Sequence, residues 1–234
     1  MAGRLALITG VGRAGQVGES VARLFAERGD YVLLVSRDLA EVTMRADALI
    51  ADGLSATPYA CDLADANAVH DLAARIAGEH GSALDVLVNL AGGFALSGSV
   101  GESVPTSWDK MSRINLVTAY TATRAFLPRL REARGAVVFF ASAAALPGST
   151  VSGMWTYAAA KGAVVTLMRA VAQEERAVGV RANAVAPTTI RTESNVAEMG
   201  EKVRYVERED VAAAVWFLCS DAARAVTGQV VRLD

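Results

Sequence analysis

Two side chains with a possible chemical use stand four residues apart in the second half of the chain. Tyr157 and Lys161 fall in a stretch that predicts a helix over Thr156–Ala177, and residues four apart on a helix share a face. A phenol has an ordinary pKa of about 10, and a nearby ammonium group favours its charged form. The spacing therefore indicates an acid–base pair, although a tyrosine packed in the core of an amphipathic helix would give the same pattern.

A glycine-rich segment near the start of the chain indicates a phosphate-binding turn. It follows an expected strand, Leu5–Thr9, and leads into an expected helix, Gly18–Arg28. Glycines let the backbone turn tightly and approach a pyrophosphate, and a helix N-terminus supplies free N–H groups and partial positive charge. An ordinary flexible turn is the alternative, but the position between strand and helix favours a dinucleotide site. The candidate contacts are Gly10, Gly12, Arg13, Gly15 and Gly18.

Short apolar runs alternate with longer helical patterns along the whole chain. Several runs, such as residues 86–88, are continuously apolar, which suits a parallel sheet covered on both faces. Alternating strands and helices predict a single α/β domain over residues 1–234, a doubly wound (Rossmann-type) parallel sheet with helices on both faces. The other expected strands are Tyr31–Ser36, Ser55–Ala60, Val86–Leu90, Ala136–Ala141, Arg181–Val185 and Gln229–Leu233. The other expected helices are Leu39–Ala51, Ala64–His80, Pro105–Arg131 and Glu207–Cys219.

Polar and small residues follow several of the expected strands. Open parallel sheets bind ligands at the carboxyl ends of their strands, so these residues are candidates for a site. The Asp62 carboxylate is placed to accept a hydrogen bond from an adenine amino group, or to cap the next helix. Ser142 leaves its strand directly, where a small residue could also simply close the strand. The remaining candidates at this edge are Leu63, Asn89, Ala91 and Gly92.

Taken in order, these landmarks resemble the short-chain dehydrogenase/reductase family over almost the whole chain. The matching segments are Thr9-Gly10, Asp62, Asn89-Leu90-Ala91-Gly92, Asn115, Ser142, Tyr157-Ala158-Ala159-Ala160-Lys161 and Asn183-Ala184-Val185-Ala186-Pro187. The resemblance implies an oxidoreductase that transfers a hydride between a nicotinamide cofactor and a carbonyl or secondary alcohol substrate. The alternative from another class is a non-catalytic, nucleotide-sensing binding protein on the same fold, because fold alone does not decide function.

The resemblance also implies individual roles. Tyr157 exchanges the proton of the substrate hydroxyl, and Lys161 lowers the Tyr157 pKa together with a positively charged nicotinamide and holds the nicotinamide ribose. Ser142 hydrogen-bonds the substrate oxygen and Tyr157, and Asn115 kinks its helix and positions a water of the proton relay. The residues that the resemblance places at the nicotinamide end of the cofactor are Pro187, Ile190 and Thr192.

The chain departs from the family pattern in several places. The glycine-rich turn is about two residues longer than usual, which leaves open whether Gly12 or Gly15 contacts phosphate. Ser142 lies fifteen residues before Tyr157 instead of thirteen, and Ser149 and Ser152 also precede it. The segment that corresponds to the family's substrate lid, residues 193–205, is short.

The residues after the second expected strand bear on the choice of cofactor. By the family pattern, Ser36 stands where a carboxylate would bind the ribose 2′-hydroxyl of NAD(H), and Arg37 follows it. A guanidinium group pairs well with a 2′-phosphate, so NADP(H) is favoured. NAD(H) stays possible, because Arg37 could be a solvated surface charge and Asp38 could either cap the next helix or turn back toward the ribose.

Composition excludes several other classes. A formal net charge of -2 gives no basic excess for nucleic-acid binding. No apolar run reaches the roughly 18 residues of a membrane span, and no leader pattern appears, so we expect a soluble cytoplasmic protein. Cys61 and Cys219 are far apart and form no metal-ligand pattern, so we expect both to be buried and no metal to bind. The family resemblance implies a homodimer or homotetramer, paired through the helices around Asn115 and Tyr157.

Overall fold

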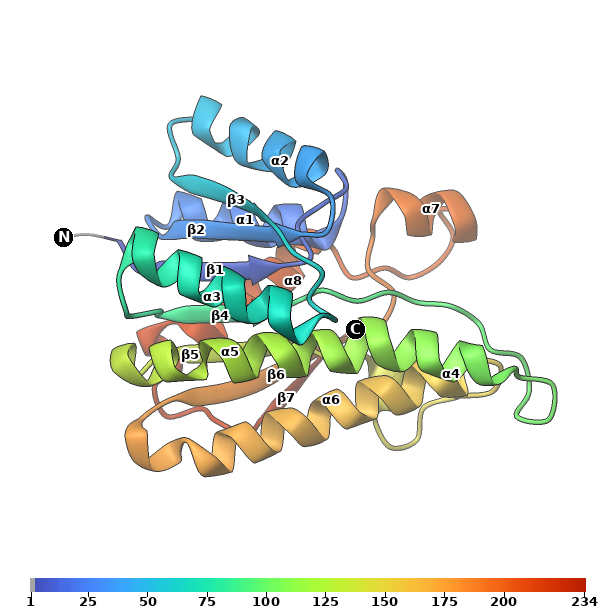
Figure 1. Cartoon of the computed structure of the whole chain (residues 1–234). Coiled ribbons are helices and arrows are strands. Elements are labelled where there is room, and N and C mark those ends of the chain that lie inside the picture. Colours follow the sequence, from blue (N-terminus) through green and yellow to red (C-terminus); the bar gives the residue numbers. More distant parts are fainter. Residues whose placement is uncertain (1–2) are drawn as a thin grey trace.

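The computed structural model describes residues 3–234, and its centre is one parallel sheet (Figure 1). The order of the strands is β3-β2-β1-β4-β5-β6-β7, and every neighbouring pair is parallel. The strand order therefore reverses between β1 and β4, the place where such sheets bind ligands. The strands are β1 (Leu5–Thr9), β2 (Tyr31–Ser36), β3 (Ala56–Ala60), β4 (Val86–Asn89), β5 (Ala136–Phe140), β6 (Arg181–Pro187) and β7 (Val230–Leu233).

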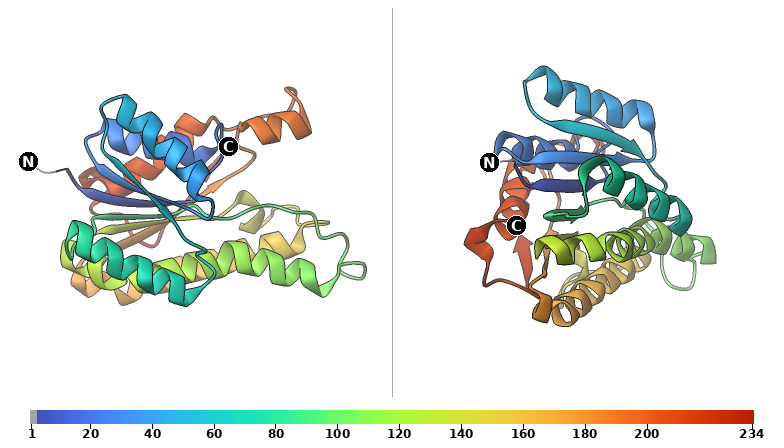
Figure 2. Two further views of the ribbon diagram at one scale, coloured as in Figure 1. Left: turned by 45° about the horizontal axis from the view of Figure 1, so that its top comes forward. Right: turned by 60° about the vertical axis from the view of Figure 1, so that its left-hand side comes forward.

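Helices cover both faces of the sheet, as the views in Figures 1 and 2 show. Successive residues of a strand serve opposite faces: Leu7 packs in one apolar cluster and Ile8 in the other. The first cluster includes residues of α3 (Ala66–His80), α5 (Thr118–Ala133) and α6 (Trp155–Glu174). The second includes residues of α1 (Val17–Glu27), α2 (Leu39–Ala51) and α8 (Arg208–Cys219). The expected doubly wound α/β fold is confirmed, and Cys61 and Cys219 are buried as expected.

The expected helix over Pro105–Arg131 has three parts. It begins as α4 (Pro105–Met111), widens into a π-helix, η1 (Ser112–Val117), and continues as α5. The irregular part contains Asn115, the residue expected to kink this helix. Because π-helical turns occur mostly as single bulges inside α-helices, often at functional sites, this position is a candidate for a role beyond packing.

One helix escaped the sequence analysis. It is α7 (Glu193–Met199), which Thr192 caps through its side chain and which ends at Gly200. Seven residues are too few to show a helical period. Three short 3₁₀ turns, η2 (Ala143–Ala145), η3 (Arg176–Val178) and η4 (Asp221–Ala223), complete the helical segments. Among residues 3–234, no helix has the length and apolar character that crossing a membrane requires.

The position of Gly18, in the first turn of α1, has too little space for a side chain. A Cβ atom there would lie 2.6 Å from the carbonyl oxygen of Gly10. Gly18→Ala should therefore lower the free energy of unfolding by about 1–3 kcal/mol, because the backbone must move to relieve the overlap. Urea denaturation followed by circular dichroism measures this change.

Gly78 is the matched control, because it also lies in a helix but has open space around it. Gly78→Ala should raise the free energy of unfolding by about 0.5–1 kcal/mol through helix propensity alone. If Gly18→Ala raises the free energy of unfolding as Gly78→Ala does, the close approach of Gly18 to Gly10 does not constrain the turn.

Candidate active site

The glycine-rich turn and the segment after β4 are joined through one buried hydroxyl. Thr9 Oγ1 donates to the carbonyl of Val88 at 3.1 Å and accepts from the amides of Leu90 and Ala91 at 3.0 and 3.1 Å. Gly10 follows at φ +78°, and a Cβ on it would lie 2.9 Å from Ala91. The carboxyl ends of β1 and β4 thus form a single unit on either side of the strand-order reversal.

Asn115 holds the other side of the same segment. Its Nδ2 donates to the carbonyls of Gly93 at 3.0 Å and Met111 at 3.1 Å, and its Oδ1 accepts from the Gly93 amide at 3.2 Å. The side chain is almost fully buried. Asn115 therefore bridges the π-helical turn and the chain that follows β4, a direct contact that sequence spacing does not reveal.

Lys161 lies next to this bridge at the floor of the site. It is 5% exposed, and its Nζ donates to the carbonyl of Phe140 at the end of β5 at 2.8 Å. A Cβ on Gly92 would lie 3.3 Å from the same Nζ and 2.5 Å from Asn115 Oδ1, so only a glycine fits there. Burial alone lowers the pKa of the Lys161 ammonium to about 8.

Tyr157 lies one helical turn before Lys161, with Ser142 beside it. Burial raises the pKa of Tyr157, and the hydrogen bond with Ser142 lowers it in part. The Lys161 Nζ is 5.9 Å from the centre of the tyrosine ring and is directed to Phe140. Among the protein's own groups, burial is the largest influence on the Tyr157 pKa, so the expected joint lowering by Lys161 and a positively charged nicotinamide stays a prediction.

Ser142 and Ser149 make different hydrogen bonds. Ser142 sits at the end of β5, where its Oγ also accepts from the Ala144 amide at 3.3 Å. Ser149 instead donates to the carbonyl of Ala143 at 2.6 Å, and only Ser142 acts on the Tyr157 pKa. The structure thus brings Ser142, Tyr157 and Lys161 together at the carboxyl edge of the sheet.

Asp62 lies at the far end of the same edge, where its carboxylate contacts two groups. Its Oδ1 accepts from the Ala64 amide at 3.0 Å, and its Oδ2 pairs with the Arg113 guanidinium at 3.0 Å. These two contacts lower the Asp62 pKa, with a smaller contribution from Arg37. The cap of α3 is Asp65, so the alternative of Asp62 as the helix cap is wrong. Arg113, two residues before Asn115, was not singled out from the sequence.

The carboxylate of Glu41 in α2, which the sequence analysis did not single out, lies near the tip of β2. Asp38 caps α2 by accepting from the Glu41 amide at 3.0 Å, which leaves Ser36 and Arg37 exposed or partly exposed at the tip. Glu41 Oε2 and Ser36 Oγ each lie 2.8 Å from where a Cβ on Gly12 would stand. Negative and positive side chains therefore both lie near the expected ribose position.

Two expected cofactor residues point their side chains inward. Asn89 is buried and its Nδ2 donates to Thr123 Oγ1 at 2.8 Å, while Leu63 packs in the core between the sheet and its helices. Any contact of these two residues with a cofactor must therefore use the main chain. Arg13 is exposed in the glycine-rich turn, in reach of solvent.

The segment after β6 closes the site on its third side. Pro187 ends β6, Ile190 pairs with Val206, and Thr192 Oγ1 accepts from the Asn195 amide as the cap of α7. The Glu193 amide donates to the carbonyl of Gly15 at 3.3 Å. The start of α7 therefore lies against the glycine-rich turn, although the two are far apart in the sequence (Figure 1).

Comparison with known proteins gives one consistent answer. Residues 10–234 match the family described as Enoyl-(Acyl carrier protein) reductase. The chain is 31% identical to dehydrogenase/reductase SDR family member 4 of Oryctolagus cuniculus, covering 99% of this chain and 92% of that protein. It is 32% identical to meso-2,3-butanediol dehydrogenase of Serratia marcescens, covering 99% and 93%. A crystal structure of a short chain dehydrogenase from Mycobacterium smegmatis superimposes with a TM-score of 0.86 at 30% identity, covering 99% and 92%.

The buried ammonium of Lys161 should cost the folded chain stability. Lys161→Met should raise the free energy of unfolding at pH 7 by about 1–3 kcal/mol, since a pKa unit corresponds to about 1.4 kcal/mol and the lost hydrogen bond to Phe140 offsets part of the gain. The folded pKa is lowered, so between about 8 and the ordinary 10.5 the unfolded chain binds more protons and the unsubstituted protein gains stability as the pH rises. The advantage of the variant should therefore shrink above pH 8.

Urea unfolding without cofactor at pH 7 and at about pH 9.5, a pH inside the window of the lowered pKa, measures the effect. Exposed Lys110 supplies the control, because Lys110→Met removes a solvated ammonium from α4. A stability difference for Lys161→Met that does not depend on pH would contradict the lowered pKa.

Proposed function

Because the chain belongs to the short-chain dehydrogenase/reductase family, whose oxidoreductases use NAD(H) or NADP(H), we propose that it transfers a hydride between NADP(H) and a carbonyl or secondary alcohol substrate. The observation that carries the proposal is the meeting of Ser142, Tyr157 and Lys161 at the carboxyl ends of the central strands. Oligomeric state and cellular location stay predictions.

The nicotinamide ring supplies or accepts the hydride when it is bound. In the reduction direction, Tyr157 donates its proton to the substrate oxygen as negative charge develops there, and Ser142 donates a hydrogen bond to the same oxygen. A protonated phenol is the form that burial favours, because burial raises the Tyr157 pKa. At neutral pH the site is thus prepared for proton donation to a carbonyl.

Lys161 helps to return a proton to Tyr157 after the tyrosine has donated its own to the substrate. With a pKa lowered to about 8, its ammonium exchanges a proton near neutral pH far more readily than an exposed lysine does. In the alcohol-oxidation direction, a nearby cation stabilises the phenolate that Tyr157 must become. Positive charge on the oxidised nicotinamide would add to this effect, since Lys161 alone does not offset the burial of Tyr157.

Apolar side chains around Tyr157 suit a small-molecule substrate with an apolar part. The ring of Phe94 meets the ring of Tyr157 edge-on, with centres 5.1 Å apart. Phe94 is 55% exposed and Leu96 is 71% exposed, so neither is accounted for by core packing. Both belong to the segment that follows β4, and Phe94 lies where a substrate carbon skeleton would contact Tyr157.

Tyr157→Phe should leave the fold and cofactor affinity nearly unchanged and lower kcat by about 10²–10⁴-fold, because it removes only the acid–base hydroxyl. A panel of ketones and aldehydes, followed by cofactor absorbance, identifies a substrate for the measurement. Fluorescence titration of the cofactor checks that binding persists. Near-normal turnover by this variant would refute the proposed role of Tyr157. If no substrate were found for the unsubstituted protein, the nucleotide-sensing alternative would be favoured instead.

Cofactor preference rests on the charges at the tip of β2. Arg37 is exposed there, while Glu41 lies by Ser36 and Gly12, so the two side chains act in opposite directions on a 2′-phosphate. We expect kcat/KM to be higher with NADPH than with NADH. Arg37→Ala should lower the NADPH value about tenfold or more, since a charged hydrogen-bonding pair is lost.

Glu41→Gln is the matched substitution, because it removes a negative charge from the same surface and keeps the side-chain shape. It should increase the preference for NADPH. Steady-state measurements with both cofactors at equal concentration decide the question. A higher kcat/KM with NADH in the unsubstituted protein would contradict the preference, and an Arg37→Ala variant with full NADPH activity would contradict its cause.

A further inference from the structure

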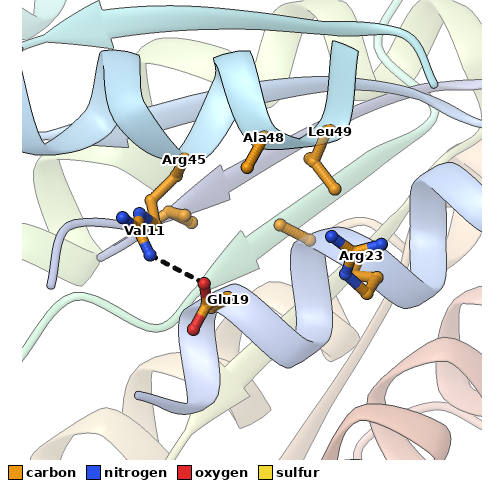
Figure 3. Close-up of a pocket in the computed structure, with 7 residues that line it drawn as sticks. Val11, Glu19, Arg23, Arg45, Ala48 and Leu49 are labelled. Atoms are coloured by element: carbon orange, nitrogen blue, oxygen red, sulfur yellow. Dashed lines mark hydrogen bonds and ion pairs between the residues drawn. The ribbon is translucent and has the colours of Figure 1, made fainter. Parts of the chain in front are cut away.

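An ion pair lies directly behind the glycine-rich turn, and Figure 3 shows it. Glu19, in the first turn of α1, accepts from the Gly15 amide through Oε2 at 2.8 Å and from Arg45 Nη1 of α2 through Oε1 at 2.7 Å. The carboxylate is 35% exposed and the guanidinium side chain 16%. Glu19 thus makes its two contacts with different oxygens, one to the turn and one to a neighbouring helix.

The contact with Gly15 falls within the glycine-rich turn, which is longer than the family pattern. Gly15 has φ +66°, a conformation that residues with a Cβ rarely adopt, and its amide is committed to Glu19. The N-cap of α1, Gln16, makes no side-chain capping bond, so the first turn of the helix keeps amide groups free for an anion. Glu19 therefore fixes Gly15 beside the first turn of α1.

The negative charge of Glu19 disfavours an anion at the start of α1, and Arg45 offsets that charge. A negative charge in the first turn of α1 would repel a pyrophosphate that binds at that helix end. Arg45 pairs with Glu19 and offsets its charge, and the guanidinium is anchored on α2, the helix that follows the tip of β2. Glu19 thus keeps its hydrogen bond to the Gly15 amide, while its pairing with Arg45 reduces its repulsion of a bound pyrophosphate.

We propose that Glu19 and Arg45 are a positioning pair for the cofactor pyrophosphate, in which Glu19 shapes the lengthened turn and Arg45 neutralises Glu19. The inference rests on the nicotinamide-cofactor site of the proposed function. It assigns the Gly15 amide to Glu19, so the phosphate takes its hydrogen bonds from other amides of the turn and of the start of α1. Neither residue touches the reacting atoms.

A purely structural ion pair between α1 and α2 is the competing explanation, and the chain contains its control. Arg23 of α1 pairs with Asp52, at the end of α2, at 2.8 Å, and both side chains are partly exposed. This second pair joins the same two helices but has no contact with the glycine-rich turn. Arg23→Met therefore reports what the loss of an α1–α2 ion pair does to stability and to cofactor binding.

The test compares four variants by fluorescence titration of NADPH and NADH and by thermal unfolding. Arg45→Met leaves the Glu19 charge without its partner and should weaken binding of the preferred cofactor about tenfold, with kcat at saturating cofactor unchanged. Adding Glu19→Gln to Arg45→Met removes the charge but keeps an oxygen for Gly15, and should restore affinity to within about threefold of the unsubstituted protein. Glu19→Ala, which loses the hydrogen bond, should also bind about tenfold more weakly. Arg23→Met should leave affinity unchanged.

Salt dependence gives an independent readout. The affinity gap between Arg45→Met and the unsubstituted protein should narrow as sodium chloride is raised, because added salt screens the repulsion between Glu19 and the pyrophosphate. Unchanged affinity in Arg45→Met, or a double variant that binds as weakly as Arg45→Met alone, would overturn the positioning role. If the unsubstituted protein bound neither nicotinamide cofactor, the proposed function itself would fail, and the inference with it.

Discussion

The hydrogen bond from Lys161 to the carbonyl of Phe140 fixes the geometry of the whole site. It ties the buried face of α6 to the carboxyl end of β5, so Tyr157, one turn earlier, stands beside Ser142 at the end of the same strand. A buried ammonium is costly to desolvate, and its lowered pKa of about 8 is the measure of that cost. The surrounding fold must supply enough apolar burial to hold this group in place.

The close approach of neighbouring chain segments follows from the same constraint. Gly92 has no room for a Cβ because Lys161 and Asn115 occupy that space, and Asn115 in turn needs the π-helical turn to reach Gly93. Thr9 completes the arrangement by joining the segment after β4 to the turn after β1. The proposed catalytic and cofactor ends of the site are thus parts of one edge, joined by hydrogen bonds between the side chains of Thr9 and Asn115 and the main chain.

The fold was predictable because its signals are local. Continuous apolar strands, glycines between the first strand and helix, and the four-residue spacing of Tyr157 and Lys161 are all visible in the sequence, and they predicted every strand of the sheet and one helix that carries both Tyr157 and Lys161. The expectation that Ser142 acts beside Tyr157 came from the family resemblance instead. Helix α7 was missed because seven residues show no period. The pairing of Arg113 with Asp62, and the position of Glu41 near Gly12, depend on side chains meeting across the fold. Sequence spacing also does not report the burial that raises the Tyr157 pKa in the folded chain.

Helix α7 borders the site with only seven residues. Its capping residue, Thr192, belongs to the residues expected at the nicotinamide end, and the next amide, that of Glu193, donates to the Gly15 carbonyl in the glycine-rich turn. Gly15 is therefore held from two sides, by Glu19 through its amide and by Glu193 through its carbonyl. A helix as short as α7 gains little stability from its own length, so its position depends on such contacts with the turn. The conformation of the glycine-rich turn and the position of α7 consequently depend on the same residue, Gly15.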